Sequence, residues 1–312
     1  MIDFVGKKQW FFLISWILLI TGIASLIISQ IQLGTPLRLG TDFAGGTSMT
    51  LQFSPAVEQS RLREEMTKLG YDKATIQNAG EGTFIIHVTE LTSEQAHELA
   101  GELGAALDSE VKIGDYYLAS PTVGAKAAQS AVIAVIVASI AMLFYIIWAF
   151  RRMPKSFRWG SCAVIALVHD VLITVGLFSL LGLIAGVEID ALFITALLTI
   201  VGYSINNIVV VFDRIRENKA RGLSSDFALT VNSSIVETVG RCLNTSLTTI
   251  FVILALFLFG GATIHYFVLV LLVGVVVGTY DSICVAGPLL VVWEKGEWSS
   301  LLPWTKRPAS SS

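Results

Sequence analysis

Long apolar runs alternate with short polar segments along most of this chain. Six of the runs have the length that an α-helix needs to cross the hydrocarbon core of a bilayer, roughly 20 residues. They cover residues 10–31, 127–150, 159–183, 189–212, 242–259 and 266–292. The one long polar interval separates the first run from the second. The pattern therefore predicts a polytopic α-helical membrane protein with six transmembrane helices and one soluble domain between helices 1 and 2.

The interval between the first two runs has the alternation of a small α+β domain. Strands are expected at 47–53, 74–78, 83–88 and 111–119, and helices at about 55–70 and 92–107. Thr92 or Ser93 can cap the second helix, with Glu94 and Gln95 in its first turn. The order β-α-β-β-α-β predicts a ferredoxin-like sandwich of two helices on a sheet.

Positive charges fall on one side of the predicted membrane. Lys and Arg lie before the first run, between the second and third, between the fourth and fifth, and after the sixth, whereas the turns 184–188 and 260–265 have none. Because cytoplasmic loops carry the excess of Lys and Arg, both termini are expected in the cytoplasm. The first run is too long for a typical signal-peptide core and no A-x-A-like site follows it, so an uncleaved signal-anchor is expected.

These observations divide the chain into four predicted parts. A cytoplasmic N-terminus and the first helix cover residues 1–31, and an extracytoplasmic domain covers 32–126. A five-helix transmembrane bundle covers 127–293, and a cytoplasmic tail covers 294–312.

Polar and ionisable residues inside the apolar runs are the candidate functional groups, because they are costly in a bilayer and usually face protein or a water path. The candidates are Asp170, Asn206, Asn207, Arg241, Thr245 and Asp281. Structural roles compete with function: amides can link helices, hydroxyls often bond their own preceding carbonyls, and Arg241 can snorkel to the interface. For Asp170 and Asp281, a functional role or an obligatory buried pair is favoured over accident.

The residues give little support to catalysis or metal binding. A glycine-rich nucleotide loop, H-E-x-x-H and G-x-S-x-G are all absent from the sequence. His87 and His97 have no second ligand at metal spacing. His169 and Asp170 are neighbours whose side chains point about 100° apart on a helix, so they are not expected to act on one atom. We expect a transport or insertion role with no cofactor, metal or nucleic acid.

Four stretches carry a resemblance to a known family. They are residues 40–47 (GTDFAGGT), 164–171 (VIALVHDV), 202–218 (GYSINNIVVVFDRIREN) and 258–261 (LFGG). Together with six runs and one exported segment, they make the chain similar over nearly its whole length to the SecF subunits of the SecD/SecF family, in the RND superfamily.

The resemblance implies a role in the bacterial plasma membrane. The chain is expected to pair with SecD and to associate with the SecYEG channel, which SecA serves from the cytoplasm. The pair is expected to use the proton gradient to assist translocation of an unfolded polypeptide on the outer side. Asp42, Gly45 and Gly46 are expected at a hinge between domain and membrane.

Two positions depart from the family pattern. The family usually has Asp where this chain has Asn207, near the position matched by Arg241, and an amide cannot carry a proton. The chain is then uncoupled, relies on a carboxylate of SecD, or carries an engineered substitution. The family also usually has a small residue where this chain has Asp281. One hypothesis is that the carboxylate has moved from the fourth span to the sixth, so that Asp281 pairs with Arg241 and is the proton site.

Two other functions stay open. An RND-like exporter of lipids or small molecules usually needs two six-span halves and larger exported loops. A structural adaptor for SecD, which does not titrate, is made more plausible by Asn207.

Overall fold

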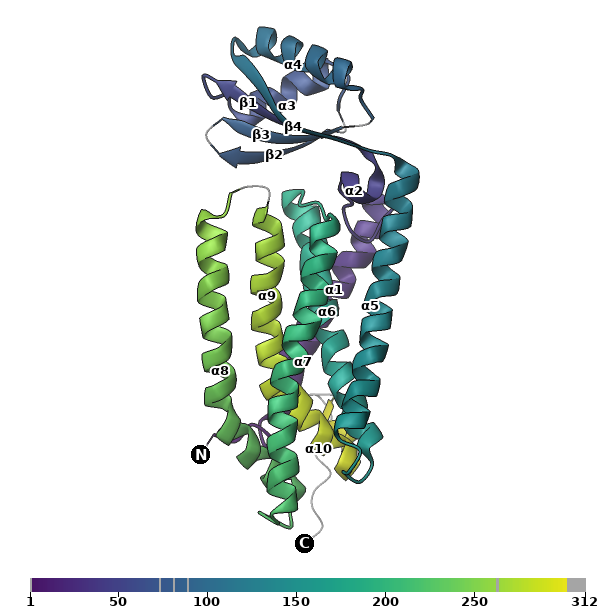
Figure 1. The fold of residues 1–312 in the computed structure, drawn as a ribbon, viewed down its shortest axis with the longest axis vertical. Coiled ribbons are helices and arrows are strands. Elements are labelled where there is room, and N and C mark those ends of the chain that lie inside the picture. Colours follow the sequence, from purple (N-terminus) through teal and green to yellow (C-terminus); the bar gives the residue numbers. More distant parts are fainter. Residues whose placement is uncertain (1, 73, 81, 89, 262–263, 302–312) are drawn as a thin grey trace.

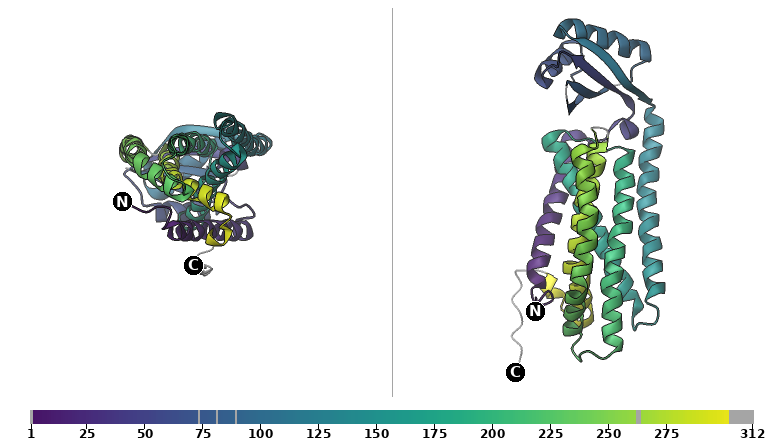
Figure 2. Two further views of the ribbon diagram at one scale, coloured as in Figure 1. Left: turned by 90° about the horizontal axis from the view of Figure 1, so that it is seen from below. Right: turned by 60° about the vertical axis from the view of Figure 1, so that its left-hand side comes forward.

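The structure, a computed structural model, has two parts and describes residues 2–301 apart from 73, 81, 89, 262 and 263. A bundle of long helices forms one part, and a small α+β domain caps one end of it (Figures 1 and 2). The first helix of the bundle begins, and its last helix ends, at the end remote from this domain (Figure 1).

The bundle confirms the predicted membrane class. Within the described residues, six helical segments are long and apolar enough to cross a membrane. They are α1 (Lys8–Leu33), α5 (Pro121–Ala149), α6 (Ser156–Ala185), α7 (Ala191–Ala220), α8 (Phe227–Phe259) and a last segment made of α9 (His265–Asp281), η2 (Ser282–Ala286) and α10 (Gly287–Lys295). Helix α7 continues past its apolar run to Ala220, and α8 begins before its run at Phe227, so both have a polar helical segment at the end where they are joined.

The last span contains a π-helical turn that the apolar run 266–292 does not predict. The turn η2 follows Asp281 directly and leads into α10, whose second residue is Pro288. Proline has no N–H to donate to the carbonyl of Cys284, so a regular α-helical ladder cannot pass through this point. Such π-helical turns are frequent at functional sites.

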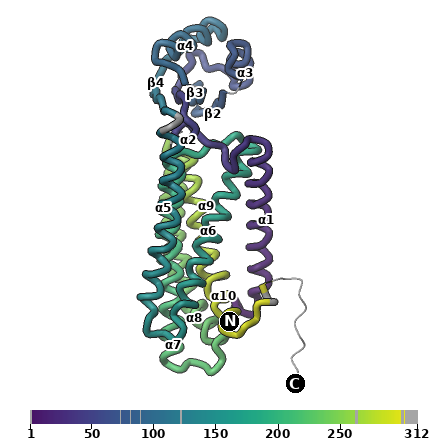
Figure 3. The backbone as a smooth tube through the Cα atoms, turned by 90° about the vertical axis from the view of Figure 1, so that its right-hand side faces the viewer, coloured from purple at the N-terminus to yellow at the C-terminus, as the bar shows by residue number. Residues whose placement is uncertain are grey.

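Helices α6, α7 and α9 form the centre of the bundle, and α1 and α5 lie on opposite sides of α6 (Figure 3). Close approach depends on glycine. A Cβ on Gly176 of α6 would lie 2.5 Å from the Cα of Gly22 on α1, and a Cβ on Gly274 of α9 would lie 2.1 Å from Ile200 of α7. The centre is therefore tightly packed, whereas only 11% of the apolar window of α8 is buried.

The α+β domain has the ferredoxin-like topology that the sequence predicts. Its elements are β1 (Gly46–Ser54), α3 (Gln59–Lys68), β2 (Thr75–Gly80), β3 (Thr83–Val88), α4 (Ser93–Leu107) and β4 (Glu110–Ala119). The strands form one antiparallel sheet in the order β2-β3-β1-β4, and α3 and α4 cover one face (Figure 1). Thr92 caps α4 in a capping box with Gln95. Helix α3 begins at Gln59, so Pro55 precedes it rather than lying in its first turn.

A short segment joins the bundle to the domain. After α1 the chain forms a parallel bridge between Leu39 and Ile189, makes the single turn α2 (Thr41–Ala44) and enters β1. Gly45 and Gly46 have φ angles of 78° and 115°, which favour glycine. A Cβ on Gly46 would also lie 2.5 Å from the Val88 carbonyl oxygen.

Candidate functional site

Three ionisable side chains meet in the centre of the bundle. His169 and Asp170 come from α6, and Asp281 is the last residue of α9. The imidazole Nδ1 of His169 lies 2.6 Å from Oδ2 of Asp281, and one donor atom from each residue lies within 4.8 Å of the others. Asp170 and Asp281 are fully buried, and His169 is 7% exposed. We call these three residues the acid–imidazole cluster.

Two neighbouring residues pack against this cluster. Ser204 of α7 donates a hydrogen bond to Oδ2 of Asp170. Gly278 of α9 faces that pair: a Cβ there would lie 3.0 Å from the Ser204 hydroxyl and 3.5 Å from Oδ2 of Asp170. A glycine at this position therefore lets α7 and α9 close around the carboxylate.

The cluster retains polar atoms without partners. Within the described residues, Nε2 of His169, Oδ1 of Asp170 and Oδ1 of Asp281 are buried and have no hydrogen-bond partner. Two buried carboxylates are costly unless a proton or a cation neutralises one of them. The arrangement can therefore hold a proton between acidic groups and an imidazole, and its donor types also suit a divalent cation.

Asn207 lies in a separate, uncharged network. It is 2% exposed, and its Nδ2 donates to the Ser246 hydroxyl of α8 at 3.4 Å. Ser246 also contacts the hydroxyls of Tyr203 at 3.2 Å and Thr279 at 2.6 Å. These bonds tie α7, α8 and α9 together, as expected for an amide that links helices.

The hypothetical pair between Asp281 and Arg241 is not formed. Asp281 contacts His169 instead, and Arg241 lies on the exposed side of α8 with no ion pair in the part of the chain that the structure describes. Asn206 and Thr245 are exposed as well, and the Thr245 hydroxyl donates to the Arg241 carbonyl of its own helix. Of the six candidates within the spans, the fold brings only Asp170 and Asp281 together.

His169 is a member of the site that the sequence analysis sets aside. His169 and Asp170 are not expected from the sequence to act on one atom, whereas the fold brings one ligand atom of each within 4.8 Å of a carboxylate oxygen of Asp281. The one sequence signal for this contact was a carboxylate, Asp281, inside an apolar span that could pack against α6. His169 and Asp281 are 112 residues apart, so no motif spacing shows it.

Asp42, Gly45 and Gly46 lie where the bundle meets the domain. Oδ2 of Asp42 accepts the Ala191 N–H at 3.0 Å, at the start of α7. Asp190 caps the same helix by accepting the Phe193 N–H at 2.9 Å. Burial raises the pKa of Asp190, the Phe193 N–H opposes this rise, and the nearby Asp42 adds to it. Asp42 thus anchors α2 to the N-terminus of α7, and Asp190 caps that helix.

Comparison with known proteins gives the family. The sequence family described as "Protein export membrane protein SecD/SecF, C-terminal" matches residues 100–296, and the "SecD/SecF GG Motif" matches residues 32–57. The chain belongs to the SecD/SecF family. This confirms the resemblance, and it confirms the expectation of a protein-export membrane protein rather than an enzyme.

Relatives extend the SecD/SecF match to full length. "Protein translocase subunit SecF" from Thermobaculum terrenum is 39% identical, and its namesake from Anaerolinea thermophila is 37% identical, each over 100% of both chains. The crystal structure of SecDF, a translocon-associated membrane protein from Thermus, has a TM-score of 0.81 at 34% identity. The match covers 94% of this chain and 39% of that one, so the chain spans about two fifths of that structure.

Proposed function

We propose that this chain is an accessory subunit of the bacterial Sec machinery that works with SecD and uses the proton gradient to assist polypeptide translocation. The buried acid–imidazole cluster carries the proposal. It offers titratable groups in the middle of the bundle, where Asn207 offers none. A proton can pass between Asp281 and His169 along their 2.6 Å contact, and Asp170 is close enough to share it.

The partner follows from polar residues on the outside of the bundle. Asn206 of α7 and Arg241 and Asn244 of α8 are exposed, and within the described residues no hydrogen bond or ion pair satisfies their side chains. Exposing such polar groups to lipid costs free energy. A second six-span half from SecD would cover them, which agrees with a match to only two fifths of the SecDF chain. SecYEG, with SecA on the cytoplasmic side, completes the proposed assembly.

The orientation follows from charge. The Lys- and Arg-rich loops after α5 and α7 lie at the end of the bundle remote from the domain (Figure 1). By the positive-inside rule, this charge distribution supports an orientation with that end in the cytoplasm of a bacterial plasma membrane and the domain outside it.

Export measured with and without a proton gradient tests the proposal. Proteoliposomes would contain SecYEG, SecD and this chain, with SecA, ATP and an unfolded preprotein supplied outside them. We expect Asp281→Asn or Asp170→Asn to remove the gradient-stimulated part of export and to leave ATP-driven export intact. The physical reason is that an amide keeps the shape of the carboxylate and cannot bind a proton.

Asp213→Asn is the matched control. Asp213 is an exposed carboxylate of α7 that pairs with Arg216 at 2.5 Å, and its loss should not change gradient stimulation. Full stimulation in both Asp170→Asn and Asp281→Asn would overturn proton coupling through the cluster. It would favour the structural adaptor, for which the neutral Asn207 network is the supporting observation.

A further inference from the structure

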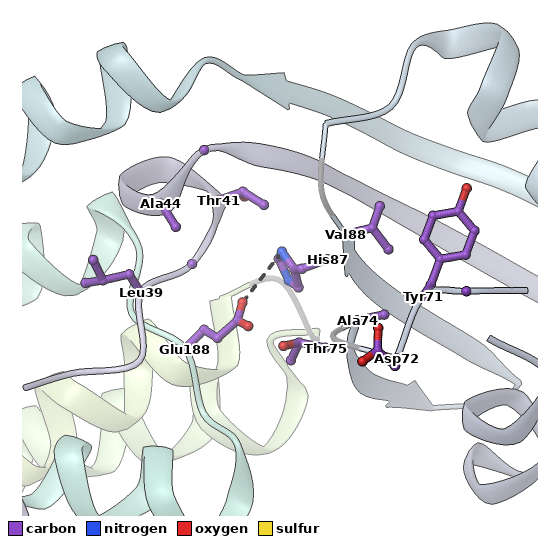
Figure 4. Close-up of a pocket in the computed structure, with 13 residues that line it drawn as sticks. Leu39, Thr41, Ala44, Tyr71, Asp72, Ala74, Thr75, His87, Val88 and Glu188 are labelled. Atoms are coloured by element: carbon purple, nitrogen blue, oxygen red, sulfur yellow. Dashed lines mark ion pairs between the residues drawn. The ribbon is translucent and has the colours of Figure 1, made fainter. Parts of the chain in front are cut away.

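The α+β domain touches the bundle through a small set of polar side chains at a cleft. The cleft has a volume of about 210 Å³ and lies between the start of α2, the strands β2 and β3, and the turn from α6 to α7. Figure 4 shows Glu188 reaching from that turn toward His87 on β3. Nδ1 of His87 and Oε2 of Glu188 are 3.7 Å apart, and their side chains are only 18% and 9% exposed.

The contact is incomplete when the imidazole is neutral. Within the described residues, Nδ1 of His87 and Oε2 of Glu188 are buried and have no hydrogen-bond partner. Nε of Arg38 lies 3.8 Å from Oε1 of Glu188, and Nη2 of Arg38 donates to the Thr75 hydroxyl on β2 at 3.1 Å. Arg38 thus balances the Glu188 charge at long range without closing the gap to His87.

The two chain segments that connect the domain to the bundle lie side by side, away from the contact between His87 and Glu188. Gly46 at the start of β1 pairs with Ala119 at the end of β4, so the chain enters and leaves the domain side by side. Strand β4 leads into α5 (Figure 1). Strands β2 and β3 lie on the other side of β1 from β4. Their attachment to the bundle depends on side-chain contacts, among which Glu188, His87 and Arg38 are the charged ones described.

We propose that His87 and Glu188 form a pH-sensitive latch that docks the α+β domain on the bundle when its side of the membrane becomes acidic. Imidazole is the side chain that ordinarily changes charge between pH 5 and 8. Protonated His87 turns the gap to Glu188 into an ion pair with a hydrogen bond, which strengthens docking. Deprotonation leaves Arg38 alone, and the domain can tilt about the paired residues Gly46 and Ala119.

The charged groups around His87 favour stronger docking at acidic pH. From the loop before β2, Tyr71 and Asp72 also line the cleft, and Asp72 is exposed. Asp42 and Asp190 lie on the adjoining segments, where each accepts a backbone N–H at the start of α7. Thr75 of β2 and Ser48 of β1, which flank His87 in the sheet, are uncharged. Within the described residues, Arg38 is the one cation at the contact, and it is held by Glu188 and Thr75.

Distances between spin labels test the latch in the full chain, reconstituted in lipid nanodiscs. Labels would be attached to Cys at Glu102 on α4 and at Phe259 on α8, both exposed positions. The three native cysteines are buried, which directs labelling to the introduced sites. Between pH 8 and pH 6 we expect the ratio of docked to undocked domain to rise roughly fivefold, the factor that corresponds to about 1 kcal/mol.

Variants separate the latch from other pH effects. His87→Gln and Glu188→Gln should make the label distances independent of pH in this range, and His87→Lys should keep the domain docked at both pH values. His97→Gln is the matched control, because His97 is exposed on α4 and contacts the Ser93 carbonyl. A pH response that survives in His87→Gln, or a wild-type chain without any response, would overturn the proposal.

Discussion

At the scale of residues, the buried polar side chains of the bundle form two networks, one of titratable groups and one of neutral amide and hydroxyl groups. Asp170, Asp281 and His169 form the buried titratable network, whereas Asn207 joins the hydroxyl of Ser246 in a neutral one. On α7, Ser204 bonds Asp170, and Asn207 of the Ser246 network stands three residues further along the helix. Residues three apart lie on the same helix face, so a carboxylate at position 207 would lie within about one turn of the acid–imidazole cluster.

That proximity predicts a suppressor. Asn207→Asp should restore gradient-stimulated export to a chain inactivated by Asp281→Asn, because the Ser246 hydroxyl can donate to the new carboxylate. The reconstituted export assay measures this, and most of the wild-type stimulation should return. Asn207→Gln in the same background is the control, since it lengthens the side chain and adds no proton site. Equal rescue by both substitutions would show that the charge is irrelevant.

At the scale of elements, glycines on α9 set how closely it packs against α7. A Cβ on Gly274 would overlap Ile200, and one on Gly278 would press on Ser204 beside Asp170. The geometry of the acid–imidazole cluster thus depends on two residues with no polar side chain. Gly186 acts differently, because it ends α6 with a φ of 67° instead of packing against another helix.

The packing argument predicts a difference between two Gly→Ala substitutions. Gly274→Ala should lower the stability of the bundle by about 1–3 kcal/mol, the usual cost of overpacking a dense core. Gly240→Ala on α8 meets nothing within 4 Å and should be neutral or raise stability by up to about 1 kcal/mol. Thermal unfolding in detergent measures both. Equal melting temperatures for the two variants would contradict close packing at Gly274.

Sequence patterns predicted the elements far better than the site. Apolar runs and the capping box at Thr92 are local signals, and they located the spans and the domain. The partner of Asp281 depends on which face of α9 meets α6, and one helix's periodicity does not contain that information. The assignment to Arg241 followed distance along the spans alone, whereas packing turned Arg241 outward and Asp281 inward.

At the scale of the whole molecule, the bundle is buried unevenly. The last span and the central helices α6 and α7 bury half or more of their apolar windows, whereas α5 and α8 bury only 11%. The exposed surface of α5 is apolar over most of its length, as lipid requires. That of α8 also carries Arg241 and Asn244, and α7 adds Asn206. A protein partner would gain the most binding free energy on this polar surface of α7 and α8, because lipid offers its side chains no hydrogen bonds.

This asymmetry predicts which substitutions release SecD. Asn206→Leu combined with Asn244→Leu should lower the amount of SecD that co-purifies with the chain roughly fivefold to tenfold. Two interhelical hydrogen bonds lost at about 0.6 kcal/mol each, the average in a membrane protein, correspond to a factor of roughly eight, and leucine makes the surface acceptable to lipid. Phe144→Leu, on the exposed apolar face of α5, is the control and should not change SecD recovery. Because both amides are exposed, the chain's own melting temperature should stay the same. Undiminished recovery with the double variant would place the SecD surface on another side of the bundle.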